Sequence, residues 1–220
     1  MALNKLKFNS LNVTPTAGKG IGFNSSADGL EATFEGGAMT FIKKLTASSS
    51  GTLSFVDGSS DVVLDSTYKE YLFLFKDIHP ATDQTSLLFQ GNAAGGSGYN
   101  ETITSTGWQA QHSEGDATEL SYETGSDQAQ GTAFQKISHE LGTDNDQCAA
   151  GYLHLFNPSS TTFFKHYISK FNAYRYNDYS QTHFSAGYFN TTSAIDAIQF
   201  KFSSGDIDAG TIKLYGIKDS

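Results

Sequence analysis

The chain has 220 residues, a formal net charge of -9 and only 17% charged residues, with 22 glycines, 17 phenylalanines and 11 tyrosines. An acidic chain lacks the basic face that a phosphate backbone requires, which argues against nucleic-acid binding. The single cysteine, Cys148, excludes a disulfide within the chain and a four-cysteine zinc site. Few charges combined with many small polar and aromatic residues are typical of β-rich proteins.

The N-terminus carries no recognisable targeting signal. Residues 1–10 are polar and alternating, without the apolar core of a signal peptide. The longest dense apolar run, residues 71–75, is far too short to span a bilayer. We therefore expect assembly in a host cytoplasm and no membrane contact.

The first part of the chain differs from the rest. It has an alternating apolar pattern, then a glycine-rich stretch, then apolar residues scattered among glycines. We expect an extended N-terminal arm or small β element over residues 1–48, attached to a β domain over residues 49–220. Such an arm buries little surface of its own and usually packs on a neighbour, so Phe8, Leu11 and Val13 are candidate interface residues.

Strand signals dominate the remainder. Short apolar or alternating segments are bounded by Gly, Asn, Asp and Pro. The expected strands are residues 71–75, 86–90, 99–111, 151–156, 163–176 and 184–189. The first of them should stop at Asp77 and at His79-Pro80. Residues 117–135 have no clear apolar face and are expected to form a long connection with one short strand at 120–122.

The C-terminal segment gives the clearest pattern. Apolar residues alternate with polar ones over 198–202 and again over 212–214, on either side of a Gly/Asp-rich connector. This predicts two sequential strands that form an antiparallel pair. About eight strands with regularly spaced turns, and no sustained helical period, predict an all-β fold, an antiparallel β-sandwich or jelly roll.

A glycine-lysine pair near the N-terminus falls short of a phosphate-binding loop. Gly18 and Lys19 fit the motif, but Val13 stands in place of its first glycine and Gly20 in place of its final Ser or Thr. The segment therefore predicts a flexible turn.

Several polar residues have the types that metals prefer. His154 and His166 should both lie on strands and could share a sheet face, either as a metal pair or as ordinary strand histidines. Asp144 begins a calcium-like loop that lacks the later glycine and glutamate, and Asp206 and Asp208 share a turn. Weak calcium binding and hydrogen bonding to the local backbone are the two alternatives. On balance the sequence predicts no metal and no cofactor.

Two glutamates and the cysteine are the candidates for catalysis. Glu119 and Glu123 would share one face of a strand about 13 Å apart, too far for either glycosidase geometry. Cys148 has no cationic neighbour in the sequence, which favours an unreactive thiol. The sequence therefore predicts no catalytic residues.

A polar-aromatic stretch follows the longest expected strand. Tyr174, Tyr176 and Tyr179 alternate with Arg, Asn and Asp. Exposed tyrosines suit both sugar stacking and protein interfaces. We favour an interface, with sugar binding as the alternative.

Three segments of the chain resemble structural proteins of tailed bacteriophages of marine bacteria, including cyanophages. They are LNKLKFNSLNVTP at residues 3–15, YLFLFKDIHPATD at 71–83, and the end of the chain from IQF to GTIKLYGI at 198–217. The likeness is one of sequence texture. It implies a virion component with a jelly-roll-like sandwich, present in many copies, and it transfers no catalytic residue.

From these observations we expect a non-enzymatic virion structural protein, a capsid decoration or surface protein held by its N-terminal arm. Its partners would be other capsid or tail proteins and further copies of itself, a trimer being one form. A tail fibre, tail adaptor or neck component is the alternative. A carbohydrate-binding module for attachment to a host surface glycan is a further one.

Overall fold

The computed structural model describes residues 20–24, 26, 28–34 and 37–219. The predicted arm contacts Phe8, Leu11 and Val13 lie outside these residues. The chain divides into two compact units, Met1–Thr40 and Phe41–Ser220. The sequence pattern suggested a boundary after residue 48, a few residues further along the chain.

The first unit contains a β-hairpin. Strand β1 (Gly20–Phe23) pairs antiparallel with β2 (Leu30–Phe34). The Asn24 side chain organises the turn between them, since its Oδ1 accepts hydrogen bonds from the backbone N–H groups of Asp28 and Gly29. Asparagine suits this place because its short side chain can bond to nearby backbone groups.

The remaining strands begin at Met39 and fill most of the second unit. They are β3 (Met39–Thr46), β4 (Leu53–Val56), β5 (Glu70–Pro80), β6 (Leu87–Ala93), β7 (Ile103–Ser113), β8 (Thr118–Tyr122), β9 (Ala129–Gly131), β10 (Gln135–Lys136), β11 (Ala149–Phe156), β12 (Lys165–Arg175), β13 (Tyr179–Phe189), β14 (Ile195–Phe202) and β15 (Ile207–Ile217). The predicted all-β class is confirmed, whereas about eight strands was too low a count. The described residues contain no helix, and hence none that could cross a membrane.

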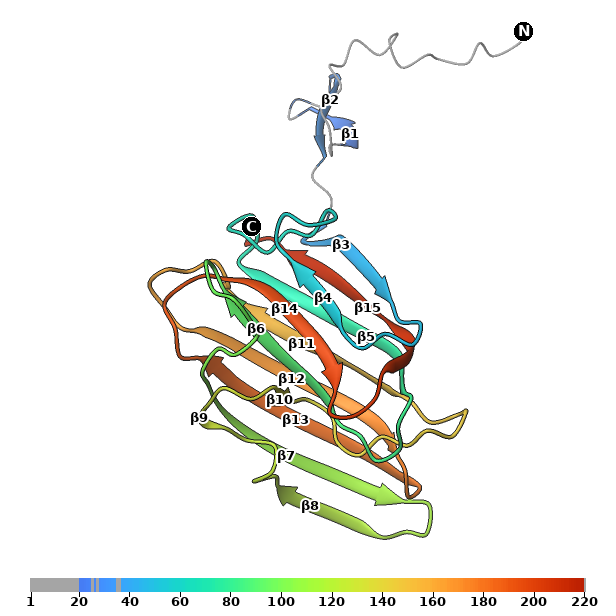
Figure 1. Ribbon diagram of the computed structural model, residues 1–220. Helices are drawn as coiled ribbons and strands as arrows, with labels where there is room; N and C mark the ends of the chain where they lie inside the picture. The colour runs from blue at the N-terminus through green and yellow to red at the C-terminus, as the bar shows by residue number, and fades with distance from the viewer. Residues whose placement is uncertain (1–19, 25, 27, 35–36, 220) are drawn as a thin grey trace, which may run out of the picture. The chain divides into compact units, whose positions relative to one another are not determined.

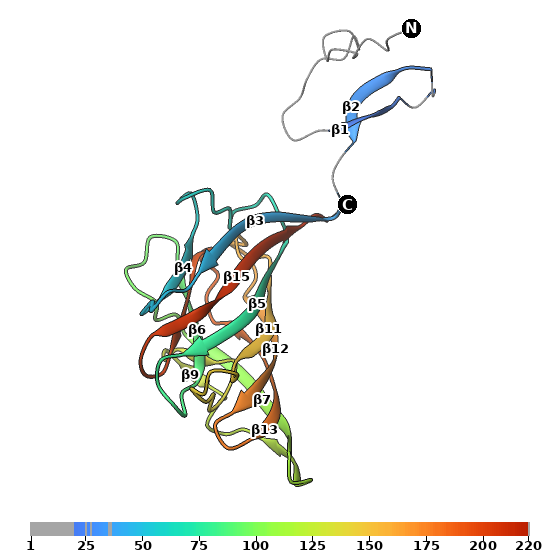
Figure 2. The same ribbon diagram turned by 90° about the vertical axis from the view of Figure 1, so that its right-hand side faces the viewer.

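The second unit is a sandwich of two antiparallel sheets. The large sheet has the order β3-β15-β5-β11-β12-β13-β7-β8, with β9 also paired to β7. The small sheet has the order β10-β6-β14-β4 and packs against one face of the large sheet (Figures 1 and 2). We call this covered face the inner face and the opposite one the outer face. Strands β3 and β8 form the two edges of the large sheet (Figure 1).

Aromatic rings fill the core between the sheets. Phe200 on β14 lies edge-on to Phe73 and Phe75 on β5, with ring centroids 5.4 Å and 5.0 Å apart. Phe89 on β6 contacts Tyr167 on β12 in the same way at 4.8 Å. Phe73, Phe75 and Tyr167 lie on the inner face of the large sheet, and Phe89 and Phe200 lie on the facing side of the small sheet. All five side chains are at least 95% buried. Edge-to-face contacts of this kind add to the free energy of burial.

The predicted pairing of the last two strands is wrong. β14 lies between β6 and β4 in the small sheet, while β15 lies between β3 and β5 in the large sheet. The connector between them therefore crosses from one sheet to the other. Alternation had shown two strands correctly, but it carries no information about which neighbours they pair with.

The expected stop at Asp77 is also wrong, because β5 continues through it to Pro80. Asp77 has a φ of 53° and lies where the register between β5 and β15 shifts. Gly210 faces it with a φ of 115°, and a Cβ there would lie 2.5 Å from the Asp77 carbonyl oxygen. A β-bulge at this point therefore allows β5 to continue through residues that usually form turns.

Candidate functional site

Toward the β8 edge, the inner face of the large sheet changes from apolar to polar. The register places Gln111 on β7 opposite Gln181 on β13 and Glu119 on β8. One step along, Gln109 lies opposite Ser121. All these side chains share one face because residues two apart on a strand point the same way. We call this group the polar patch and include the partners given below.

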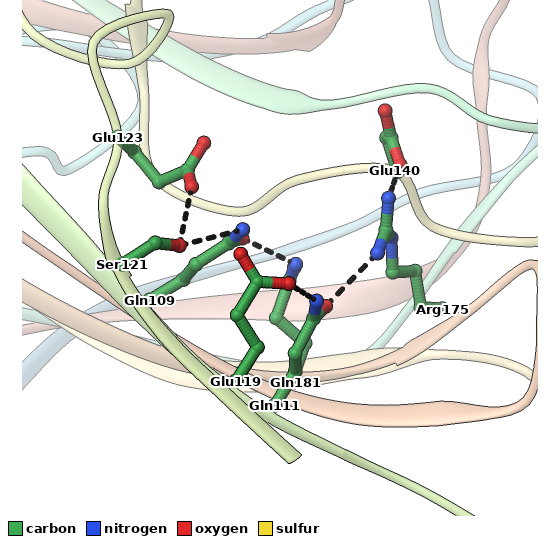
Figure 3. Close-up of polar contacts among 8 residues, drawn as sticks. All are labelled: Gln109, Gln111, Glu119, Ser121, Glu123, Glu140, Arg175 and Gln181. Carbon is green, nitrogen blue, oxygen red and sulfur yellow. Dashed lines mark hydrogen bonds and ion pairs between the residues drawn. The ribbon is translucent and has the colours of Figure 1, made fainter. Parts of the chain in front are cut away.

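The first row of hydrogen bonds in the polar patch joins side chains from β12, β7 and β8 (Figure 3). Arg175 on β12 forms an ion pair with Glu140. Its Nη1 donates to Gln111 Oε1 at 2.9 Å, and Gln111 Nε2 donates to Glu119 Oε2 at 2.6 Å. The amide therefore connects a cation at one end to a carboxylate at the other, a charge-assisted arrangement that strengthens both bonds.

A second row runs beside the first (Figure 3). Gln181 Nε2 donates to Gln109 Oε1 at 2.6 Å, and Gln109 Nε2 donates to Ser121 Oγ at 3.4 Å. Ser121 Oγ in turn donates to Glu123 Oε1 at 2.9 Å. Both rows thus end on a carboxylate at or just after β8. This confirms that Glu119 and Glu123 face the same side of the sheet.

The two rows run from a buried end to an exposed end. The exposed fraction is 0% for Gln181, 6% for Gln109 and 9% for Gln111, whereas Glu119 is exposed. Within the described part of the chain, Gln181 Oε1 and Arg175 Nε are buried without a hydrogen-bond partner. Buried polar atoms usually have hydrogen-bond partners. Gln181 Oε1 could therefore accept one further hydrogen bond, and Arg175 Nε could donate one.

The polar patch is rich in hydrogen-bonding groups. Amides and a guanidinium neither take up nor release protons near neutral pH, but they supply many donors and acceptors. Two carboxylates four residues apart on an extended chain are about 13 Å apart, beyond either glycosidase spacing. The hydrogen-bonded rows of the patch therefore connect the side chains of β12, β13, β7 and β8, and they stabilise this end of the sheet.

The buried His183 and the partly buried His139 lie next to this patch. Burial lowers the pKa of His183 on β13 to about 4. Burial also lowers the pKa of His139 to about 4. Both imidazoles are therefore neutral at pH 7. Burial raises the pKa of the half-buried Cys148 thiol, which keeps it protonated and agrees with an unreactive thiol.

The tyrosines of the predicted interface separate into two environments. Tyr174 lies on the outer face, where its hydroxyl donates to Glu114 Oε1 at 3.2 Å and to Asp178 Oδ1 at 3.3 Å. Burial and these carboxylates raise its pKa to about 12. Tyr174 and these two carboxylate residues line a hollow of about 390 Å³. The other lining residues are His112, Ser113, Asn172, Ala173 and Ser180.

Tyr176 and Tyr179 lie instead beside the polar patch. The Arg175 guanidinium carbon is 5.6 Å from the ring centre of Tyr176 and 6.0 Å from that of Tyr179. These cation–π contacts hold the arginine that begins the first row. The three tyrosines therefore do not form one surface.

Three of the candidate metal ligands, His154, His166 and Asp208, have contacts with local partners. His154 and His166 do share the outer face, but His154 Nε2 lies 2.8 Å from Glu70 Oε2 while His166 packs near Tyr188. Asp208 accepts a hydrogen bond from Ser49 at 3.0 Å. In the described ranges, no three residues of the ligating types come together around one point.

Large side chains lie along the outer face. Trp108 on β7 stacks on Phe184 of β13 with ring centroids 5.6 Å apart, and Phe164 stacks on Tyr188 at the same distance. Trp108 is 40% exposed and Phe164 44%. Aromatic residues are enriched in the centres of protein interfaces, so this face suits contact with another molecule.

Sequence reasoning missed the amides of the polar patch. The available signal was the spacing of Gln109 and Gln111, two residues apart in a strand and next to the only tryptophan. No family model, curated protein or solved structure matches the chain, so its function has to be inferred from its own sequence and geometry.

Proposed function

We propose that the chain is a non-enzymatic structural protein of a tailed-bacteriophage particle, a capsid decoration or surface protein attached through its N-terminal region. The observation that carries this proposal is the division of the chain into a unit of residues 1–40 and a sandwich of residues 41–220. A short unit joined to a much larger compact one suits attachment by the first and display of the second. The resemblance of residues 3–15, 71–83 and 198–217 to marine phage structural proteins supports the same reading.

The sandwich itself supports a role in a multi-subunit particle. Its outer face carries exposed aromatic residues, and interfaces concentrate such residues. Its inner face carries hydrogen-bonded rows that connect neighbouring strands and stabilise the end of the large sheet. Partners would then be other virion proteins and further copies of the chain.

Particles purified from a lysate of the phage that encodes the chain test this proposal. Quantitative mass spectrometry should find the chain on the order of hundreds of copies per particle, as closed symmetric shells require. A few dozen copies or fewer would indicate a tail, adaptor or neck component instead. Absence from the particle would refute the proposal.

A deletion tests the attachment. Particles that lack the chain should recover it when mixed with the full-length protein, but not when mixed with residues 41–220. The circular dichroism spectrum of the shortened protein should be that of a folded β-sheet protein. Equal rebinding of both proteins would refute attachment through the N-terminal region.

The hollow at Tyr174 favours a second candidate function, binding of a host surface glycan. It combines one aromatic ring with hydroxyl, amide and carboxylate groups, the mixture that stacks on a sugar ring and bonds to its hydroxyls. Tyr174→Ala should abolish binding on a glycan array, and Tyr174→Phe should keep part of it. A wild-type protein that binds no glycan would remove this candidate.

A further inference from the structure

In the part of the chain that the structure describes, the large sheet ends at β8, and β7 is the one strand that pairs with it (Figure 1). The other side of β8 has no partner among these residues. The hydrogen bonds from Glu123 N–H to the Gly107 carbonyl, at 2.9 Å, and from Ser113 N–H to the Ala117 carbonyl, at 2.8 Å, fix which residues face β7. Bonding alternates along an antiparallel ladder, so the backbone groups of Thr118, Leu120 and Tyr122 point away from β7.

The two edges of the large sheet are protected differently. β3, at the far edge, carries Lys43 and Lys44, and edge lysines discourage pairing with another chain. β8 has no lysine, proline or bulge. Its one charge, Glu119, is turned to the inner face, where it accepts the hydrogen bond from Gln111. β8 is therefore the edge open to pairing.

Two large side chains at this edge are exposed on the outer face. Leu120 is 74% exposed and Tyr122 54%, and both lie on the outer face beside Trp108. These three residues and Ser121 line a hollow of about 350 Å³. A strand laid against β8 would cover apolar surface and satisfy backbone groups at the same time.

We propose that β8 pairs antiparallel with β8 of a second copy of this chain, about a twofold axis at Leu120, so that two large sheets join into one. Leu120 then faces Leu120 of the second copy, and Thr118 faces Tyr122 of the second copy. Each of these facing pairs exchanges two backbone hydrogen bonds, because all three residues present outward N–H and C=O groups. The contact is self-complementary, as a twofold interface requires.

The side chains of β8 are compatible with a second copy as the occupant. In this register Glu119 faces Ser121 of the second copy on the inner face, so that no carboxylate lies directly opposite another. Leucine meets leucine on the outer face. The polar patches of the two copies also become neighbours, since their hydrogen-bonded rows end at β8. This inference is independent of whether the chain is part of a virion.

A charge exchange at position 120 tests the proposal on the full-length chain. By analytical ultracentrifugation the wild type should be a dimer. L120K should raise the dissociation constant at least about tenfold, since two lysines would face each other directly, and L120E should do the same. An equimolar mixture of the two variants should restore the dimer as a mixed pair, because opposite charges then face each other.

The controls separate this contact from other surfaces and from unfolding. Thr106 is exposed on the outer face of β7, away from the edge, so T106K should leave the dimer unchanged. Leu120 contributes little to the core at 74% exposure, so all variants should unfold at the wild-type temperature when they are compared at a concentration at which the wild type is also monomeric. Trp108, the only tryptophan, reports the contact directly, and its emission should shift to shorter wavelength on dimerisation.

Three results would overturn the proposal. A wild type that stays monomeric at all accessible concentrations leaves the edge to a strand of some other protein. An oligomer that L120K does not weaken uses another surface. Failure of the two variants to form a mixed dimer means that residue 120 does not face itself.

Discussion

The inner face of the large sheet has two halves that solve the same burial problem with different chemistry. Under the small sheet, phenylalanine rings such as Phe73 and Phe75 pack against Phe200. Toward β8, the same alternate positions carry Gln109 and Gln181, which are 6% and 0% exposed. The first half is stabilised by removing apolar area from water, and the second depends on the pairing of amides with each other.

The comparison shows that alternation determines which residues share a face without requiring that face to be apolar. An amide can be buried where a neighbouring strand offers a partner at the right register, as Gln109 does for Gln181. Such a pair tolerates change poorly, since removing one member leaves the other buried and unpaired. A substitution in the apolar half should therefore cause the larger loss of stability. In the polar half, the loss caused by one substitution should depend on whether its hydrogen-bond partner is still present.

The largest effect is expected in the apolar half. Phe200→Ala removes a fully buried ring from contact with four other phenylalanines, and should lower the free energy of unfolding by about 3–5 kcal/mol. Urea denaturation measures it. Phe163→Ala is the control, because that ring is 69% exposed and its loss should change stability by less than about 0.5 kcal/mol. Similar losses for both variants would contradict the assigned core.

The second prediction concerns pairing in the polar half. Gln181→Leu removes the donor to Gln109 Oε1 and should cost about 1–3 kcal/mol. The double variant Gln181→Leu with Gln109→Leu should recover part of that loss, since neither amide is then left alone. A double-mutant cycle by urea denaturation gives the coupling. Strictly additive losses would mean that the two amides do not depend on each other.

The third prediction concerns pH. Burial holds the pKa of His183 at about 4 in the folded protein, below the ordinary value of 6.5. The unfolded chain therefore binds the proton first as pH falls from 6.5 toward 4, and the folded state loses stability by at most about 1.4 kcal/mol per pH unit from this group. His139 should add a second contribution of the same sign.

The variant His183→Gln isolates this effect. Its unfolding temperature should fall less steeply than that of the wild type between pH 6.5 and 4, and the two slopes should agree above pH 7. Thermal unfolding followed by circular dichroism at a series of pH values provides the comparison. Parallel slopes throughout would show that His183 ionises normally.

The smallest effect is expected at the exposed end of the polar patch. Glu119→Gln keeps an oxygen that can accept the hydrogen bond from Gln111 and removes only an exposed charge. The free energy of unfolding should change by less than about 0.5 kcal/mol. A loss above about 2 kcal/mol would mean that the charge itself holds the first row together.

Much of the strand content was predictable. The expected strands at 71–75, 86–90, 151–156 and 163–176 correspond to β5, β6, β11 and β12. The short strand expected at 120–122 is β8, the edge of the large sheet. These segments were found because apolar alternation and turn residues are local signals.

The candidate site was less predictable. Glu119 and Glu123 were singled out and do share a face, but their amide partners on β7 and β13 were not identified. Gln111 and Gln181 are seventy positions apart in the chain, and only the pairing of β13 with β7 brings them side by side. Tyr174 and Tyr176 show the reverse case, neighbours in the sequence that the structure places in separate environments.

The sequence alone determined the all-β class and the positions of most strands, because a period of two is written residue by residue. Only the tertiary structure decided that β14 and β15 belong to different sheets, that one inner half is apolar and the other polar, and that β8 is an open edge. The physical reason is that side-chain alternation specifies two faces for each strand. The neighbour of each strand, and what covers each face, follow from contacts between residues far apart in the chain.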